Sequence, residues 1–229
     1  MHGIELIVFD FDGLILDTET PDYQAWQEIY AEHGQSLSFD RYAEGIGVRA
    51  GAVDYVGILN ALAGTALERA TVEARHRARL REILAQRPLR PGVRAHIEAA
   101  RRMGLRLAVA SSATRSWVTG HLEQRGVLAA FDAVRTIEDV GQGKPAPDLY
   151  LAVLDALDVR PHAAVAYEDS PNGLLAARRA GMRTVAVPNP ITERLDLSGA
   201  DVEIPSLADT PLPELLARLD GTERAAKPK

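Results

Sequence analysis

The 229-residue chain contains no cysteine, which excludes both a disulfide framework and a metal site built from thiolates. Its six histidines are scattered and show no metal-binding spacing such as His-Glu-x-x-His. We expect no secretion signal, because the first residues enter a strand almost at once, and no apolar run approaches the ~20 residues of a membrane span. Acidic residues outnumber basic ones, and the resulting net charge of −6 argues against a dedicated nucleic-acid binder. We therefore expect a monomeric cytoplasmic protein that binds neither membranes nor nucleic acid.

The most informative stretch that is present comes at the start of the chain. An apolar run, Leu6–Phe9, predicts a buried parallel strand. It is followed by Asp10 and Asp12, whose spacing places both carboxylates on the same side of an extended chain. One such aspartate would be explained as a cap of the next element, but two acids at the end of a buried strand are costly to leave unpaired. The pair therefore indicates a functional site.

The remainder of the chain divides into a helical block and an alternating α/β block. Residues 19–33 have helical spacing and residues 38–87 show no strand pattern, whereas from Pro91 a helix, a glycine and a buried strand follow one another repeatedly. We predict a doubly wound parallel sheet formed by residues 1–15 and 88–229, with residues 16–87 inserted as a helical cap domain. Expected helices of the cap lie at 19–33, 38–44, 50–63 and 65–86; later strands lie at 105–110, near Val134, at 163–167 and at 184–187; the polar tail, 221–229, is expected to be irregular.

Chemically useful residues follow the later strands as well. Ser111 and Ser112 follow one strand, Lys144 lies in a loop before a helix, and Glu168 and Asp169 end another strand. Each has an ordinary explanation alone: a helix cap, a solvated lysine, and acids at a helix N-terminus. Because ligands of such sheets bind beyond the carboxyl ends of the strands, the set predicts one oxygen-rich site for Mg²⁺ and a phosphate group.

In their order along the chain, these residues resemble the four motifs of the haloacid dehalogenase superfamily of phosphohydrolases. The Asp-x-Asp pair, the serine, the lysine and the Glu-Asp pair match, and the resemblance covers the whole core. The helical insertion resembles the cap of the β-phosphoglucomutase-like subfamily, as does the Glu-Asp-Ser-Pro-Asn-Gly run at 168–173. The resemblance implies a Rossmann-like core and a Mg²⁺-dependent transfer of a phosphoryl group.

The resemblance also implies a role for each acid of the site. Asp10 is the expected nucleophile and forms an aspartyl-phosphate. Asp12 is the expected general acid and base. The expected metal ligands are Asp10, Asp169 and the backbone carbonyl of Asp12, with Glu168 close by.

Lys144 and the serines are expected to act on the phosphate itself. The resemblance implies that Ser111 and Lys144 hold the transferring phosphoryl group, with Ser112 beside them in the same phosphate-binding turn. Lys144 also counts among the catalytic residues, because a fixed ammonium offsets the charge of the phosphate and the acids.

Two cap residues bear on the substrate. Arg49 matches an arginine that several family members use on the distal part of the substrate, although it can equally be a solvated cap arginine. Asp22 aligns with a cap-hinge histidine of β-phosphoglucomutases, and an ionised Asp22 cannot donate the hydrogen bond that this histidine makes. We expect the coupling of a mutase to be absent, so that water reaches the aspartyl-phosphate.

Other noticeable residues are expected to have structural roles. Arg75, His76, Arg77, Arg79 and Arg81 cover several sides of one helix and are expected to form a solvated face. Trp26 and Trp117 lie at apolar helical positions and are interpreted as packing residues, and His96 and His121 as surface residues.

The sequence thus favours a Mg²⁺-dependent phosphatase that hydrolyses a small phosphorylated metabolite, expected to be a sugar phosphate. One alternative is a mutase of the β-phosphoglucomutase type. The other is a non-enzymatic, receiver-like phospho-acceptor module, which would also combine an aspartate, a hydroxyl residue and a lysine but would lack Asp12 and the cap.

Overall fold

The computed structural model describes residues 3–47, 51 and 53–226. Its centre is a six-stranded sheet in the order β3-β2-β1-β4-β5-β6, and all neighbouring strands are parallel. The predicted doubly wound α/β fold is therefore confirmed. The strands are β1 (Leu6–Phe9), β2 (Arg106–Ala110), β3 (Ala133–Arg135), β4 (Ala164–Glu168), β5 (Arg183–Ala186) and β6 (Val202–Glu203).

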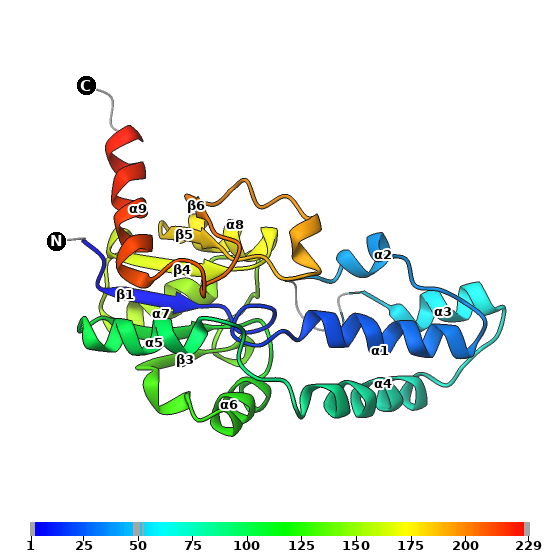
Figure 1. The fold of residues 1–229 in the computed structure, drawn as a ribbon. Helices are drawn as coiled ribbons and strands as arrows, with labels where there is room; N and C mark the ends of the chain where they lie inside the picture. Colours follow the sequence, from blue (N-terminus) through cyan, green and yellow to red (C-terminus); the bar gives the residue numbers. More distant parts are fainter. Residues whose placement is uncertain (1–2, 48–50, 52, 227–229) are drawn as a thin grey trace.

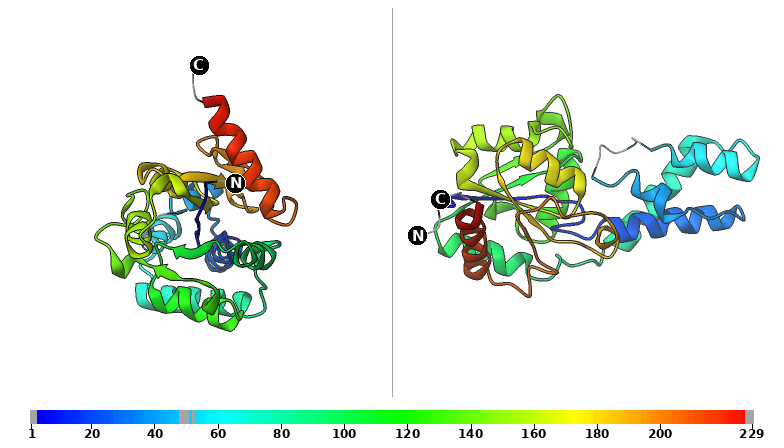
Figure 2. Two further views of the ribbon diagram at one scale, coloured as in Figure 1. Left: turned by 90° about the vertical axis from the view of Figure 1, so that its left-hand side faces the viewer. Right: turned by 90° about the horizontal axis from the view of Figure 1, so that it is seen from above.

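Helices cover both faces of the sheet (Figure 2). Every side chain of β1 is buried, and the alternation of a strand sends neighbouring residues to opposite faces. Leu6 and Val8 pack in one apolar cluster with α7 (Asp148–Leu157) and α8 (Pro171–Arg179). Ile7 and Phe9 pack in the other, whose helices are α5 (Val93–Arg102), α6 (Arg115–Gln124) and α9 (Leu212–Ala226).

The helical block between β1 and α5 lies beyond the carboxyl end of the sheet (Figure 1). It has its own apolar cluster, which includes Trp26, Tyr30 and Leu59. Ile191 of the core joins this cluster, and the Asn172 amide donates a hydrogen bond of 3.1 Å to the Ile46 carbonyl across the domain boundary. The exact limits of the cap, 16 and 87, stay a prediction. Its helices are α1 (Glu19–Glu32), α2 (Phe39–Ala43), α3 (Tyr55–Ala63) and α4 (Arg69–Leu84).

Two arginines stabilise the two segments that connect the cap to the core. Arg87, just after α4, forms an ion pair of 2.7 Å with Asp17, just before α1. Arg125 at the end of α6 donates hydrogen bonds to the carbonyls of Leu84, at 3.1 Å, and Arg87, at 2.9 Å. Because carbonyls at a helix C-terminus lack partners within the helix, a guanidinium here both caps α4 and holds it to the core.

Three expectations about the fold were incomplete or wrong. β6 at the sheet edge was not predicted. The tail was expected to be irregular, yet α9 continues to Ala226, and residues 227–229 lie outside the described part. His96 was placed at the surface but is buried, with its Nε2 2.9 Å from the Thr210 carbonyl. Within the described residues, no helix has the length and apolar character needed to cross a membrane.

Gly92 allows the chain to enter α5 close to the loop before α9. Its φ is +84°, and a Cβ atom would lie 2.2 Å from the Ala208 nitrogen and 2.2 Å from the Leu207 carbonyl carbon. Gly104 has a similar φ of +74° but open space around it. Gly92→Ala therefore adds a backbone clash that Gly104→Ala does not.

We predict that Gly92→Ala lowers the free energy of unfolding by ~3 kcal/mol or more, because strain and a forced backbone shift add together. Gly104→Ala, the matched control, should lower it by only ~1–2 kcal/mol, the cost of the left-handed conformation alone. Urea denaturation of the two variants measures both values. Equal losses would contradict the close approach at Gly92.

Candidate active site

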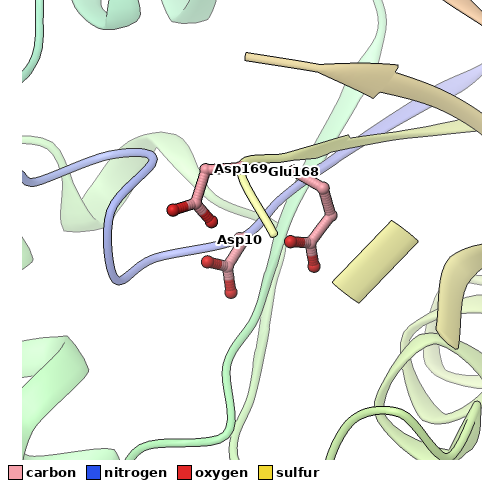
Figure 3. A group of neighbouring side chains, drawn as sticks. All are labelled: Asp10, Glu168 and Asp169. Carbon is pink, nitrogen blue, oxygen red and sulfur yellow. The ribbon is translucent and has the colours of Figure 1, made fainter. Parts of the chain in front are cut away.

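Three buried carboxylates meet at the carboxyl ends of the two central strands. Asp10 follows β1, while Glu168 ends β4 and Asp169 comes directly after it. Since β1 and β4 are parallel neighbours, their ends lie side by side, and the three side chains point toward a common space (Figure 3). One oxygen of each lies within 4.8 Å of the others. The structure thus brings together the predicted nucleophile and two of the predicted metal ligands.

Lys144 reaches this cluster from the loop before α7. Its Nζ contacts Asp10 Oδ1 and lies 2.6 Å from Glu168 Oε1. The Tyr150 hydroxyl donates a further hydrogen bond to Glu168. Burial alone would lower the pKa of Lys144, but the carboxylates of Asp10 and Glu168 raise it above its ordinary value. Lys144 therefore stays charged and is held at the nucleophile.

The charges of the cluster do not balance. Burial raises the pKa of Asp10 to about 8 against the opposing effect of Lys144, and the nearby Glu168 adds to the rise. Burial, followed by repulsion from Asp10 and Glu168, also raises the pKa of Asp169 well above its ordinary value. Hard carboxylate oxygens, buried together with one ammonium for three acids, are a donor set that fits Mg²⁺.

Asn189 fixes the orientation of Asp169, and sequence reasoning missed it. Its Nδ2 donates to Asp169 Oδ2 at 2.7 Å and to the Gly13 carbonyl at 3.3 Å. A Cβ atom at Gly13, whose φ is +80°, would lie 2.2 Å from Asp169 Oδ2. The loop after Asp12 can therefore approach the carboxylate only because residue 13 is glycine.

Asp12 lies at the opening of the cluster and accepts a hydrogen bond from Trp117 of α6. Trp117 Nε1 donates to Asp12 Oδ1 at 2.9 Å, and the Ser111 hydroxyl makes a long contact of 3.4 Å with Oδ2. Burial raises the pKa of Asp12, while the Trp117 hydrogen bond opposes the rise. Trp117 packs against the core as expected, and its indole also holds the predicted acid and base, a role that the sequence did not indicate.

The two predicted phosphate-binding serines differ in their position. Ser111 is fully buried, and its hydroxyl accepts a hydrogen bond of 3.0 Å from the Ala113 amide. Ser112 lines the cavity, and its hydroxyl accepts a 3.3 Å hydrogen bond from the Lys144 amide. Both stand at the end of β2, next to β1, so the turn they form faces the same space as Asp10 and Lys144.

The cluster opens into a cavity of about 640 Å³ between core and cap. Asp22 of α1 and His76 of α4 line this cavity, and the expected effect of Asp22 on the reaction stays a prediction. The expectation of a solvated face around His76 was wrong for this residue, which is buried and stacks on Trp26 with ring centroids 4.1 Å apart. Arg75 of that face is exposed and pairs with Glu32.

Glu19 also lines the cavity, and sequence reasoning did not assign it to the site. Its carboxylate accepts a hydrogen bond of 2.9 Å from the Tyr42 hydroxyl. Burial, then the charges of Asp22 and Asp12, raise its pKa to about 8. The signal was present in the Asp-Thr-Glu run at 17–19. Arg49 lies outside the described residues, so its contact with substrate stays a prediction.

Comparison with known proteins places this arrangement in a family. The family model of the haloacid dehalogenase-like hydrolases matches residues 4–181 of this sequence. The Bacillus subtilis protein YhcW is 40% identical over 217 residues, covering 95% of this chain and 98% of its own. Hexitol phosphatase B of Escherichia coli K12 is 30% identical over 213 residues, covering 91% and 95%.

A solved structure agrees with these matches. CbbY from Rhodobacter sphaeroides, determined as a D10N mutant in complex with xylulose-(1,5)-bisphosphate, superimposes with a TM-score of 0.72 at 30% identity, over 90% of this chain and 96% of that one. The family match, the relatives and the buried acids around Lys144 lead to one conclusion. The chain belongs to the haloacid dehalogenase-like hydrolase family and is an enzyme of its phosphatase group.

Proposed function

We propose that this enzyme is a Mg²⁺-dependent phosphatase that hydrolyses a small phosphorylated sugar or polyol through an aspartyl-phosphate on Asp10. The observation that carries the proposal is the contact of Asp10 with Lys144 inside the cluster of buried acids, with Asp12 at its opening into the cavity. The names of the relatives, a hexitol phosphatase and a protein solved with a ketose bisphosphate, support the substrate class. That the enzyme works in the cytoplasm as a monomer stays a prediction.

Mg²⁺ would be held by Asp10 and Asp169, with Glu168 beside them, and the backbone carbonyl of Asp12 is a further proposed ligand. When bound, the ion keeps the acids ionised and draws negative charge from the phosphoryl oxygens. Lys144 supplies a second cation at the same place. Ser111, Ser112 and the backbone amides of their turn are the proposed hydrogen-bond donors to the phosphoryl group.

The reaction then needs two proton transfers, and Asp12 carries out both. Asp10 attacks phosphorus, the bond to the substrate oxygen breaks, and protonated Asp12 gives its proton to the leaving alcohol. Asp12, now ionised, takes a proton from water, whose oxygen attacks the phosphorus of the aspartyl-phosphate. The acyl-phosphate bond breaks, inorganic phosphate leaves, and Asp10 returns as a carboxylate.

Two alternatives are weighed against this proposal. Membership of a hydrolase family argues against a receiver-like module. The cap bears on the mutase alternative. Position 22 is an aspartate where β-phosphoglucomutases have a histidine, but His76 of α4 lies beside it, with its Nε2 3.2 Å from Asp22 Oδ1. The test incubates the enzyme with β-glucose 1-phosphate and catalytic glucose 1,6-bisphosphate. Inorganic phosphate should form faster than glucose 6-phosphate, and the reverse would overturn the phosphatase proposal.

Asp10→Asn should lower phosphate release from sugar and polyol phosphates by ~10⁴-fold or more, because an amide cannot serve as the nucleophile. The fold should survive, since the amide is nearly isosteric. Steady-state phosphate release measures the first effect and thermal denaturation the second. Turnover within about tenfold of the wild type would refute the assignment of the nucleophile.

Asn189→Leu should weaken Mg²⁺ binding by ~10-fold or more, because the hydrogen bond that orients Asp169 is lost. The increase in melting temperature with Mg²⁺ concentration measures this affinity without an activity assay. Asn172→Leu is the matched control, since its amide donates to Ile46 and not to an acid of the site. Equal Mg²⁺ affinities in the two variants would contradict the role of Asn189.

Trp117→Phe should move the acidic limb of the kcat–pH profile to higher pH. The indole N–H stabilises ionised Asp12, so its loss raises the pKa of Asp12 further. Asp12 must be ionised to take a proton from water, and activity is therefore lost at a higher pH than in the wild type. Trp26→Phe, in the cap, should leave the limb in place. A limb that coincides with that of the wild type would show that Trp117 only packs.

A further inference from the structure

Arg90 lies near the end of the segment that returns from the cap to the core, and its guanidinium reaches two loops beside the buried acids. It donates hydrogen bonds to the carbonyls of Gly13, at 2.6 Å, and Val187, at 3.1 Å, and to that of Pro188. Its backbone amide also donates to the Ile15 carbonyl at 3.0 Å. A single residue thus joins the loop that follows β1 to the loop that follows β5.

These two loops flank the strand that carries two of the buried acids. β4 lies between β1 and β5 in the sheet, and Asp169 directly follows it. Gly13 comes directly after Asp12, and Pro188 directly before Asn189. The carbonyls that the guanidinium binds therefore stand next to groups that the proposed metal site uses.

The Gly13 carbonyl accepts hydrogen bonds from both Arg90 and Asn189. Asn189 Nδ2 donates to it at 3.3 Å and to Asp169 Oδ2 at 2.7 Å. A continuous set of hydrogen bonds therefore runs from the guanidinium to the carboxylate. Because a charged donor makes a shorter and stronger hydrogen bond than a neutral amide, Arg90 fixes this carbonyl more firmly than Asn189 does.

The charge of Arg90 also acts on the cluster of acids. Burial lowers the pKa of its guanidinium, while the charge of Asp169 opposes this effect, and an arginine remains charged in either case. Lys144 instead contacts Asp10 and Glu168. The two cations thus serve different acids of the same cluster.

We propose that Arg90 is a positioning residue of the metal site: it holds the loops after β1 and β5 together, so that Asn189 and the backbone at Asp12 keep Asp169 in the orientation that binds Mg²⁺. This inference rests on the proposed Mg²⁺-dependent function and adds a residue that the sequence patterns did not indicate. The planar fork of a guanidinium can donate to both loops at once, whereas the single ammonium of a lysine lacks this geometry.

Arg90→Met and Arg90→Lys should each weaken Mg²⁺ binding by about tenfold, as expected for a residue that orients a metal ligand. The rise in melting temperature with Mg²⁺ concentration measures the affinity without an activity assay. The Mg²⁺ concentration that gives half-maximal phosphate release provides a second value. Arg90→Lys keeps the charge and most of the side-chain volume, so it supplies a folded protein if Arg90→Met does not fold.

Arg125→Met is the matched control, because this guanidinium also binds carbonyls of the segment leading from the cap, those of Leu84 and Arg87. Its hydrogen bonds to described residues do not reach the loops after β1 and β5. The variant should lower the melting temperature and leave the Mg²⁺ affinity unchanged. An equal loss of Mg²⁺ affinity in Arg125→Met would overturn the inference, because the effect would then reflect general loosening of the fold.

A double variant tests whether Arg90 acts through Asn189. In the Asn189→Leu background, Arg90→Met should weaken Mg²⁺ binding by less than about threefold more, since residues of one hydrogen-bond network are not additive. Losses that multiply in full would overturn the inference, and so would wild-type affinity in Arg90→Lys, because charge alone would then suffice. A wild-type melting temperature that does not respond to Mg²⁺ would instead refute the proposed Mg²⁺-dependent function itself.

Discussion

The burial of like charges is the constraint on which this structure depends. Asp10, Glu168 and Asp169 are each less than a tenth exposed and stand close enough to share one ion. Such a group is costly unless cations and hydrogen-bond donors surround it. The chain answers with Lys144 at the centre and with donors from distant elements, Tyr150 of α7 among them. The parallel sheet makes this possible, because adjacent strands deliver their ends to one place while helices on both faces exclude water.

The sequence reveals those parts of the fold and site that depend on local pattern. Asp10 and Asp169 could be found because each directly follows an apolar strand. Trp117 and Asn189 could not be found, since the aspartates that they contact lie 105 and 20 residues away in the sequence. A tryptophan in a helix or an asparagine in a loop does not by itself indicate such a distant partner. His96 was misplaced, although its spacing from Val93, Ile97 and Ala100 puts it on the buried face of α5. The short edge strand β6 has only two residues and forms by pairing with β5, so no local pattern marks it.

Core and cap divide the work in a way that their charges reflect. The core supplies the buried acids and Lys144, which are the proposed reacting and metal-binding groups. The cap contributes the opposite wall of the cavity, and two guanidiniums in that wall, Arg69 and Arg77, pair with neighbouring acids. Relatives with the same core can then differ in substrate through a few cap residues.

The position of β1 in the sheet has a consequence for how the molecule comes together. β1 pairs with β2, where Leu6 faces Arg106, and with β4, where Leu6 faces Ala164. Each pairing closes a long loop of chain, and the entropy lost in closing it opposes the pairing until the strands are in contact. Contacts within the cap, such as that of α1 with α4, span fewer residues and therefore cost less. β1 thus waits for its partners β2 and β4 over a longer stretch of chain than α1 waits for α4. Asp10, which follows β1, can meet Lys144, Glu168 and Asp169 only after the chain has been synthesised through residue 169.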